Sequence, residues 1–201
     1  LTRLKSLCIT SCPSLTNLSR CKPLPRLRTI DLTSHRHIGG SSGLAHFPAM
    51  KSLFSHAEGE LPAATLTHTR ALTSLDVPRG LLRGDDCLAR VVDNSALRYL
   101  CVGALELTDP SNIAELTRLR ALGTLRIRHV SSDPRHTSIG DDKTLSHVAK
   151  LAWLTSLEFS SSRTVTDAAV GYIAQLPLLE VLDLHGCVWI TDDGIALLSK
   201  G

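Results

Sequence analysis

Residues 179–187 read Leu-Glu-Val-Leu-Asp-Leu-His-Gly-Cys, an L-x-x-L-x-L-x-x-C pattern. The L-x-x-L-x-L part of this pattern, with aliphatic replacements, occurs eight times at spacings of 22 to 32 residues. Its first positions are Leu4, Leu27, Met50, Leu72, Leu97, Leu122, Leu154 and Leu179. Such a period indicates stacked structural units, each of which contacts only its neighbours.

The repeated phrase also defines a strand. Leu182 and Leu184 flank Asp183, and this alternation is typical of a strand that is buried on one face. Aliphatic phrases at a period of about 20 to 29 residues are typical of leucine-rich repeats. We therefore predict an α/β leucine-rich repeat solenoid, a right-handed horseshoe. It should have about eight parallel strands on the concave face and helices or loops on the convex face. Residues 1–201 should form one domain.

The segments between the strands predict the convex side. Helices are expected over 109–116, 141–150, 168–175 and 190–198, because Asp or Thr residues that can cap a helix stand at their starts. The first three repeats have shorter segments rich in Ser, Pro and Gly, which predict loops or single turns. Two repeats depart from the pattern. Ser55 replaces an apolar residue, and repeat six has an insertion within Ser131–Ser138, either a functional loop or a tolerated one.

Composition restricts the setting in which the chain works. Leucine supplies 36 of 201 residues, and the net charge is only +3, which gives little reason to expect a nucleic-acid partner. The sequence has no apolar run of about 18 residues and no signal-peptide pattern, so we predict no membrane span. The six cysteines are scattered rather than paired at the ends. We expect them to be reduced, in an intracellular and cytoplasmic protein.

The two ends of the chain lack an obvious polar capping unit. Leu1 reads as the tail of an earlier helix, and the segment Leu198–Gly201 closes the last one. Solenoids need capping units for solubility. We therefore expect the chain to be a fragment of a longer protein.

Three repeats resemble a known subtype. Cys187, Ile190, Thr191 and Asp192 match the cysteine-containing leucine-rich repeats of F-box substrate receptors of ubiquitin ligases. Residues 165–173 are similar, with Ser162 in the place of the cysteine, and so is repeat one around Cys12–Leu18, which also resembles repeats of trypanosomatid proteins. The resemblance implies a parallel concave sheet that binds other proteins. The sequence has no F-box-like segment.

Two kinds of chemistry were weighed against the repeat. A zinc site could use Cys8, Cys12, Cys21, His35 and His37. The repeat instead places Cys12 at the consensus turn, as a buried thiol, and Cys8 on the concave face, so we predict no metal and no cofactor. Asp183, His185, Glu158 and Arg126 could form an acid–base row. A flat sheet offers no pocket and the sequence has no phosphate-binding loop, so we predict that the chain is not an enzyme.

The predicted concave face contains two candidate patches. The first, Phe54, His56 and Tyr99, supplies rings of the kind that dominate interface energies; alternatively, Phe54 covers the defect at Ser55. The second is Arg126, Arg128 and His129, flanked by Glu158, Asp183 and His185. It suits carboxylate or phosphate recognition; alternatively, Arg126 pairs with Glu158 across the strands.

We therefore predict a scaffold or recognition domain that binds another protein on its concave face. The partner-binding residues would be Phe54, His56, Tyr99, Arg126, Arg128, His129, Glu158, Asp183 and His185. One alternative is the substrate-receptor part of a ubiquitin ligase. Another is a structural component of a ribonucleoprotein or cytoskeletal assembly, in which Arg118, Arg120, Arg126 and Arg128 would contact RNA.

Overall fold

A sheet of parallel strands runs along the computed structural model, which describes residues 2–12, 14–15, 18, 20–33, 41–56, 59–128 and 140–200. Its main strands, in pairing order, are β1 (Ser6–Cys8), β2 (Thr29–Asp31), β3 (Ser52–Phe54), β5 (Ser74–Arg83), β6 (Tyr99–Glu106), β7 (Thr124–Arg128), β8 (Ser156–Ser160) and β9 (Val181–Asp183). All eight begin two residues after the first position of a repeat. The predicted α/β leucine-rich repeat solenoid with eight parallel strands is therefore confirmed.

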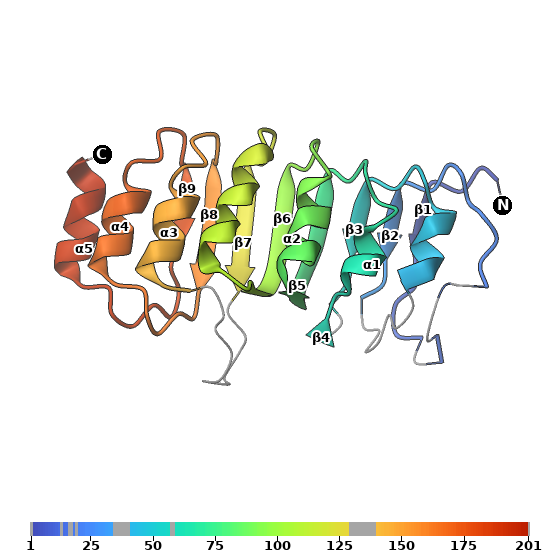
Figure 1. Ribbon diagram of the computed structural model, residues 1–201, viewed down its shortest axis with the longest axis horizontal. Coiled ribbons are helices and arrows are strands. Elements are labelled where there is room, and N and C mark those ends of the chain that lie inside the picture. The colour runs from blue at the N-terminus through green and yellow to red at the C-terminus, as the bar shows by residue number, and fades with distance from the viewer. Residues whose placement is uncertain are drawn as a thin grey trace.

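The helices cover one face of this sheet, and Figure 1 shows them as a layer in front of the strands. They are η1 (Ser41–His46), α1 (Ala63–Leu66), α2 (Asp85–Val92), η2 (Pro110–Arg118), α3 (Asp142–Val148), α4 (Asp167–Ile173), α5 (Asp192–Leu197) and η3 (Leu198–Lys200). The four helices predicted from their caps are present, η2 as a 3-10 helix. Helix α2 was not predicted, although Asp85 and Asp86 in its first turn favour a helix start.

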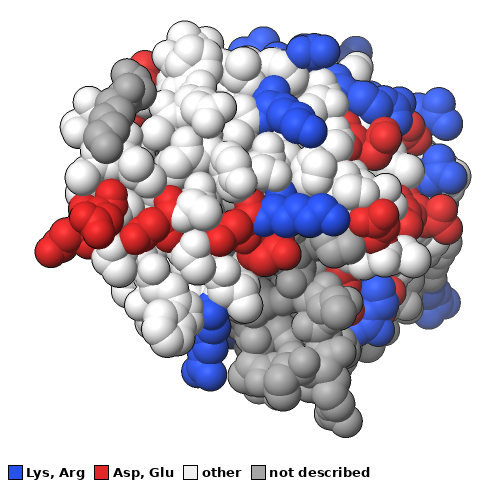
Figure 2. Space-filling model, turned by 60° about the vertical axis from the view of Figure 1, so that its left-hand side comes forward, with Lys and Arg blue, Asp and Glu red and all other residues white. Residues whose placement is uncertain are grey.

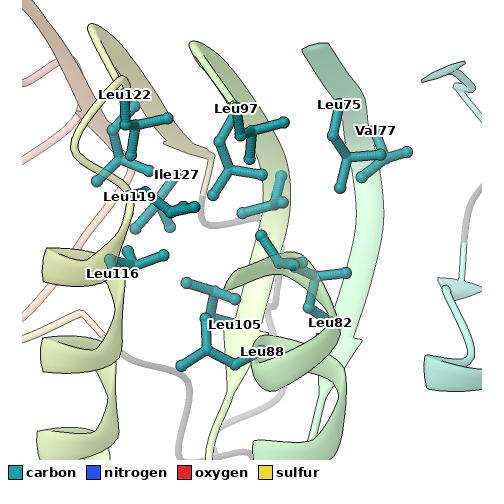
Figure 3. Close-up of a cluster of buried hydrophobic side chains, with 14 of the residues drawn as sticks. Leu75, Val77, Leu82, Leu88, Leu97, Leu105, Leu116, Leu119, Leu122 and Ile127 are labelled. Atoms are coloured by element: carbon teal, nitrogen blue, oxygen red, sulfur yellow. The ribbon is translucent and has the colours of Figure 1, made fainter. Parts of the chain in front are cut away.

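Stacked aliphatic side chains fill the space between the sheet and the helices. In the strands these residues pair with one another, as Leu125 does with Leu157, and both are fully buried. Figure 3 shows the middle of this core, where Leu105 of β6 and Leu88 of α2 lie side by side. Full burial of one such side chain contributes about 1.5–3 kcal/mol, so the repeated leucines account for the cohesion of the stack.

Polar contacts also join neighbouring repeats at the helix starts. Asp142, the first residue of α3, accepts hydrogen bonds from Thr166 through the backbone N–H at 2.8 Å and the hydroxyl at 2.6 Å. Asp167, the first residue of α4, accepts the same pair from Thr191 at 2.8 and 2.6 Å. Each threonine is the N-cap of the next helix. A carboxylate thus fixes the start of the following helix in the last three repeats.

The middle of the sheet departs from the repeat. Strands β5 and β6 continue beyond the predicted phrase, and their register shifts between Val77 and Leu81. The short strand β4 (Gly59–Glu60) pairs with the extension of β5. Pro78 and Gly103 were expected to face outward but are buried. Gly103 packs so close to the backbone of Arg79 that a Cβ atom would lie 2.9 Å from the Arg79 carbonyl carbon. The extension therefore depends on a glycine at this position.

Candidate functional site

The face of the sheet turned away from the helices, here called the outer sheet face, carries two continuous rows of side chains. The strand register aligns the central row Cys8, Asp31, Phe54, Asp76, Cys101, Arg126, Glu158 and Asp183. It also aligns the preceding row Ser6, Thr29, Ser52, Ser74, Tyr99, Thr124, Ser156 and Val181. Both rows are those expected from the repeat. The third expected row is interrupted by the buried Pro78 and Gly103.

Side chains from four neighbouring strands meet in the middle of this face. The Tyr99 hydroxyl on β6 lies 3.4 Å from Asp76 Oδ2 on β5, to which it donates. An Arg126 Nη atom on β7 donates to the same hydroxyl at 3.5 Å. The Arg126 guanidinium also lies 5.7 Å from the centre of the Tyr99 ring, a favourable cation–π distance. The phenol therefore connects the aromatic patch to the arginine patch.

Glu158 on β8 joins both arginines. Its carboxylate lies 2.6 Å from Arg128 Nε and 3.3 Å from Arg126 Nε. The Glu158 side chain is only 9% exposed, whereas the two arginines are 49% and 41% exposed. The cross-strand pairing of Arg126 and Glu158 that we weighed is therefore present. We call Asp76, Tyr99, Cys101, Arg126, Arg128 and Glu158 the Tyr99 cluster.

Burial sets the ionisation of the two weak acids in the Tyr99 cluster. Burial, with Cys101 and Asp76 nearby, raises the pKa of Tyr99 to about 12. Burial and the neighbouring Asp76 carboxylate raise the pKa of the Cys101 thiol to about 12 as well. Both groups are protonated at neutral pH. The cluster thus offers hydrogen bonds and ionic contacts, not a thiolate or phenolate nucleophile.

The remaining predicted residues lie away from this cluster. Phe54 on β3 is half-buried, and His56 directly after it is exposed. Ser55 between them is buried, and its backbone N–H donates to the Asp76 carbonyl at 2.9 Å. Asp183 on β9 and His185 are exposed. His129 and the inserted segment 131–138 lie outside the described residues.

Asp76 and Cys101 are members of the cluster that were not among the predicted site residues. Asp76 accepts the Tyr99 hydroxyl, and Cys101 is buried beside it. Both occupy the central row, so the repeat pattern placed them on the correct face. Their contact with Tyr99 depends on a diagonal reach between strands, for which the sequence gives no signal.

The cysteines were examined as metal ligands. No group of three or more His, Cys, Asp or Glu side chains in the described ranges could hold a metal ion, and His35 and His37 fall outside those ranges. All six cysteines are free thiols. Cys187 is buried and its thiol donates to the Phe159 carbonyl of the preceding repeat at 3.3 Å. Cys12, expected to be buried in the same way, is exposed, because it belongs to the first repeat and has no such preceding carbonyl.

No helix in the described part of the chain has the length and apolar character that crossing a membrane requires.

Comparison with known proteins identifies the fold. No protein-family model matches the sequence, and no curated protein matches it. Among solved structures, an internalin from Listeria monocytogenes is similar with a TM-score of 0.64 at 20% identity, covering 99% of this chain and 60% of the internalin. A leucine-rich repeat protein from Leptospira interrogans has a TM-score of 0.56 at 13% identity, covering 98% of this chain and 53% of that protein.

A receptor is a third structural neighbour. The leucine-rich repeat ectodomain of the Arabidopsis receptor kinase HAESA, in complex with an extended IDA peptide hormone, has a TM-score of 0.51 at 17% identity, covering 81% of this chain and 26% of the ectodomain. This chain spans 60% or less of the length of each of the three proteins. Together with the parallel sheet and its single layer of helices, these likenesses establish an α/β leucine-rich repeat solenoid.

Proposed function

We propose that this chain is a protein-recognition domain that binds its partner through the outer sheet face, with the Tyr99 cluster at the centre of the contact. The observation that carries this proposal is the cluster itself. It joins a half-buried tyrosine to two half-exposed arginines that a buried carboxylate holds in place. Tyrosine and arginine are the residue types that contribute most to protein interfaces. Side chains already held by their neighbours lose little entropy when a partner binds.

The wider fold supports the same class of function. HAESA, a receptor with the same fold, was solved with a peptide hormone bound. In our chain, Phe54 and His56 on one side of the cluster and Asp183 and His185 on the other would extend the contact along the sheet. We include His129 because it directly follows Arg128 in the sequence. The function requires no cofactor or catalysis.

The charges of the central row favour a protein over a nucleic acid. Arg126 and Arg128 share one carboxylate, and the same row holds Asp31, Asp76 and Asp183. Phosphate backbones require several cations that are not already paired with carboxylates. The alternative of a ribonucleoprotein component therefore has less support.

The ubiquitin-ligase alternative rests on the finer repeat resemblance. The thiol of Cys187 and the hydroxyl of Thr191, both part of the matching motif, make bonds between repeats. These bonds explain the motif by stability alone. A partner-binding scaffold is therefore the proposal that we carry forward.

The proposal can be tested with two variants of the outer sheet face. The first, Phe54→Ser with Tyr99→Thr, replaces rings with residue types that already occur in the preceding row, such as Ser52 and Thr124. The second, Arg126→Gln, Arg128→Gln and Glu158→Gln together, removes the charges but keeps hydrogen-bonding groups. Each purified variant is used to capture proteins from native lysate, with quantitative mass spectrometry. We expect the specific partners of the unaltered chain to be depleted by about tenfold or more, the usual effect of losing one hot-spot residue.

The matched control changes the opposite face. Arg90→Ala in α2 and Glu115→Ala in η2 alter half-exposed side chains of the helix layer and should leave capture unchanged. Circular dichroism and urea unfolding confirm that all variants are folded. Equal capture by the outer-face variants and the unaltered chain would overturn the proposal.

A further inference from the structure

The C-terminal end of the solenoid has exposed apolar side chains that its own fold does not cover. The exposed large hydrophobic residues of the described chain are Tyr172, Leu178, Val181, Val188, Trp189, Ile195 and Leu198, all within the last two repeats. Trp189 is 62% exposed. Figure 2 turns this end toward the viewer and shows a broad uncharged area above a band of acidic side chains. Such a patch on a monomer marks an interaction surface.

The backbone at this end shows which groups a partner would have to supply. In every earlier repeat, the carbonyl just before the strand accepts two consecutive N–H groups from the next repeat; the acceptors are Lys5, Arg28, Lys51, Thr73, Arg98, Gly123 and Thr155. The next acceptor in this series is Glu180, and no described N–H donates to its carbonyl.

A second series ends at the same place with a donor. The N–H groups of Ile9, Leu32 and Ser55 donate to the carbonyl of the central-row residue on the following strand at 2.8 to 2.9 Å. By the register of the strands, Leu184 is the equivalent residue after β9. Its N–H donates to no described carbonyl, so the end presents an acceptor and a donor at repeat spacing.

The carboxylate series of the helix starts points to the same partner. Asp142 holds Thr166 and Asp167 holds Thr191, each 24 residues further along the chain. Asp192 is the corresponding first residue of α5, is exposed, and accepts no hydrogen bond from the described residues. In both filled cases the threonine lies 11 residues after the first strand N–H donor, since 166 − 155 and 191 − 180 both equal 11.

We propose that the C-terminal end is a docking surface for one further leucine-rich repeat unit, in which a threonine that opens a helix follows the first strand N–H by 11 residues. The strand of that unit would donate two N–H groups to Glu180 and accept from Leu184. Its threonine would bind Asp192, and its aliphatic side chains would cover Leu182 and Leu184. The interface would continue the one that already joins β8 and α4 to β9 and α5. This surface is distinct from the outer sheet face.

The test supplies such a unit. A copy of residues 177–201 is appended after Gly201, with the copied tryptophan changed to phenylalanine. This design repeats the 25-residue spacing between Leu154 and Leu179 and the 24-residue spacing between Asp167 and Thr191. We expect a higher urea midpoint, a blue shift of Trp189 emission, and slower hydrogen exchange at Leu184 by about tenfold, the effect of one added hydrogen bond.

Three controls separate the causes. A Gly/Ser extension of equal length should change none of these measurements. Replacing the copied threonine with valine, or Asp192 with Asn, should lose part of the midpoint gain. An unchanged midpoint and unchanged Leu184 exchange in the extended chain would overturn the proposal. So would an equal gain with the valine copy. Self-association of the unaltered chain with concentration-dependent protection of Leu184 would instead identify a second copy as the occupant and also overturn it.

Discussion

At the residue scale, Glu158 determines the arrangement of the outer sheet face. The sequence predicted its pairing with Arg126, because a two-residue alternation and a fixed register place them opposite one another. The shorter contact, to Arg128 at 2.6 Å, was not predicted. The register partner of Arg128 is Ser160, so this bond depends on the conformation of a long side chain, which pattern and spacing do not specify.

Glu158→Gln tests this arrangement. The substitution removes the charge that two arginines share, while both arginines can be hydrated because they are about half exposed. We expect a loss of about 1 to 3 kcal/mol in the free energy of unfolding, measured with urea. Glu115→Gln, which removes an ion pair exposed on both sides, should cost about 0.5 kcal/mol or less. Equal effects of the two substitutions would show that the buried position of Glu158 is unimportant.

Asp167 predicts an acid-dependent loss of stability. Its hydrogen bonds from the hydroxyl and backbone N–H of Thr191 lower its pKa below the ordinary value of 3.8. The stabilisation is therefore complete above pH 3.8 and is lost as the pH falls through the lower folded-state pKa. Asp167→Asn should have a smaller drop in unfolding free energy between pH 5 and pH 2 than the unaltered chain. Parallel pH profiles for the two proteins would contradict this.

At the element scale, the helix starts were predictable and the irregular strands were not. Thr166 and Asp141 stand directly before predicted helices, and both cap them through a side-chain hydrogen bond to a backbone N–H. In contrast, Pro78 and Gly80 interrupt the aliphatic run of β5, and such residues ordinarily indicate a turn. Strand pairing with β4 and β6 overrides that local preference. The extension of β5 is thus a consequence of tertiary contacts.

Two glycines in the terminal helices should respond in opposite directions to the same substitution. Gly194 in α5 packs against Asp167, and an added Cβ atom would lie 2.1 Å from Asp167 Oδ1. Gly194→Ala should therefore lower the free energy of unfolding by about 1 to 3 kcal/mol. At Gly171 in α4 the added atom would meet only Leu197 Cδ1 at 3.5 Å. Gly171→Ala should raise it by about 0.5 to 1 kcal/mol. Stabilisation by both in thermal unfolding would refute the close contact at Gly194.

At the scale of the whole molecule, the repeat period accounts for the fold because each unit adds one strand and one layer of aliphatic side chains. It does not identify the partner. The sequence placed Phe54, Arg126, Glu158 and Asp183 in one row, but it could not show that Tyr99 connects them to Asp76. That link arises from side-chain conformations across four strands.

The position of a repeat in the stack should determine the cost of damaging it. Leu157 of β8 is fully buried between neighbouring repeats, whereas Leu7 of β1 is only partly buried. Leu157→Ala should cost about 2–5 kcal/mol in urea unfolding, and Leu7→Ala should cost less, because β1 has a neighbouring strand on one side only. An equal or larger cost at Leu7 would show that the stack is not stabilised mainly by contacts between neighbouring repeats.

The central claim, that a partner binds the outer sheet face, is tested most directly by site-specific photocrosslinking. A photoreactive phenylalanine replaces Phe54 beside the Tyr99 cluster or, as the matched control, Glu115 in the helix layer. After irradiation in native lysate, mass spectrometry identifies the covalent adducts. We predict a specific protein adduct from position 54 and none from position 115. Adducts from position 115 alone, or the same adduct in equal yield from both positions, would contradict the account.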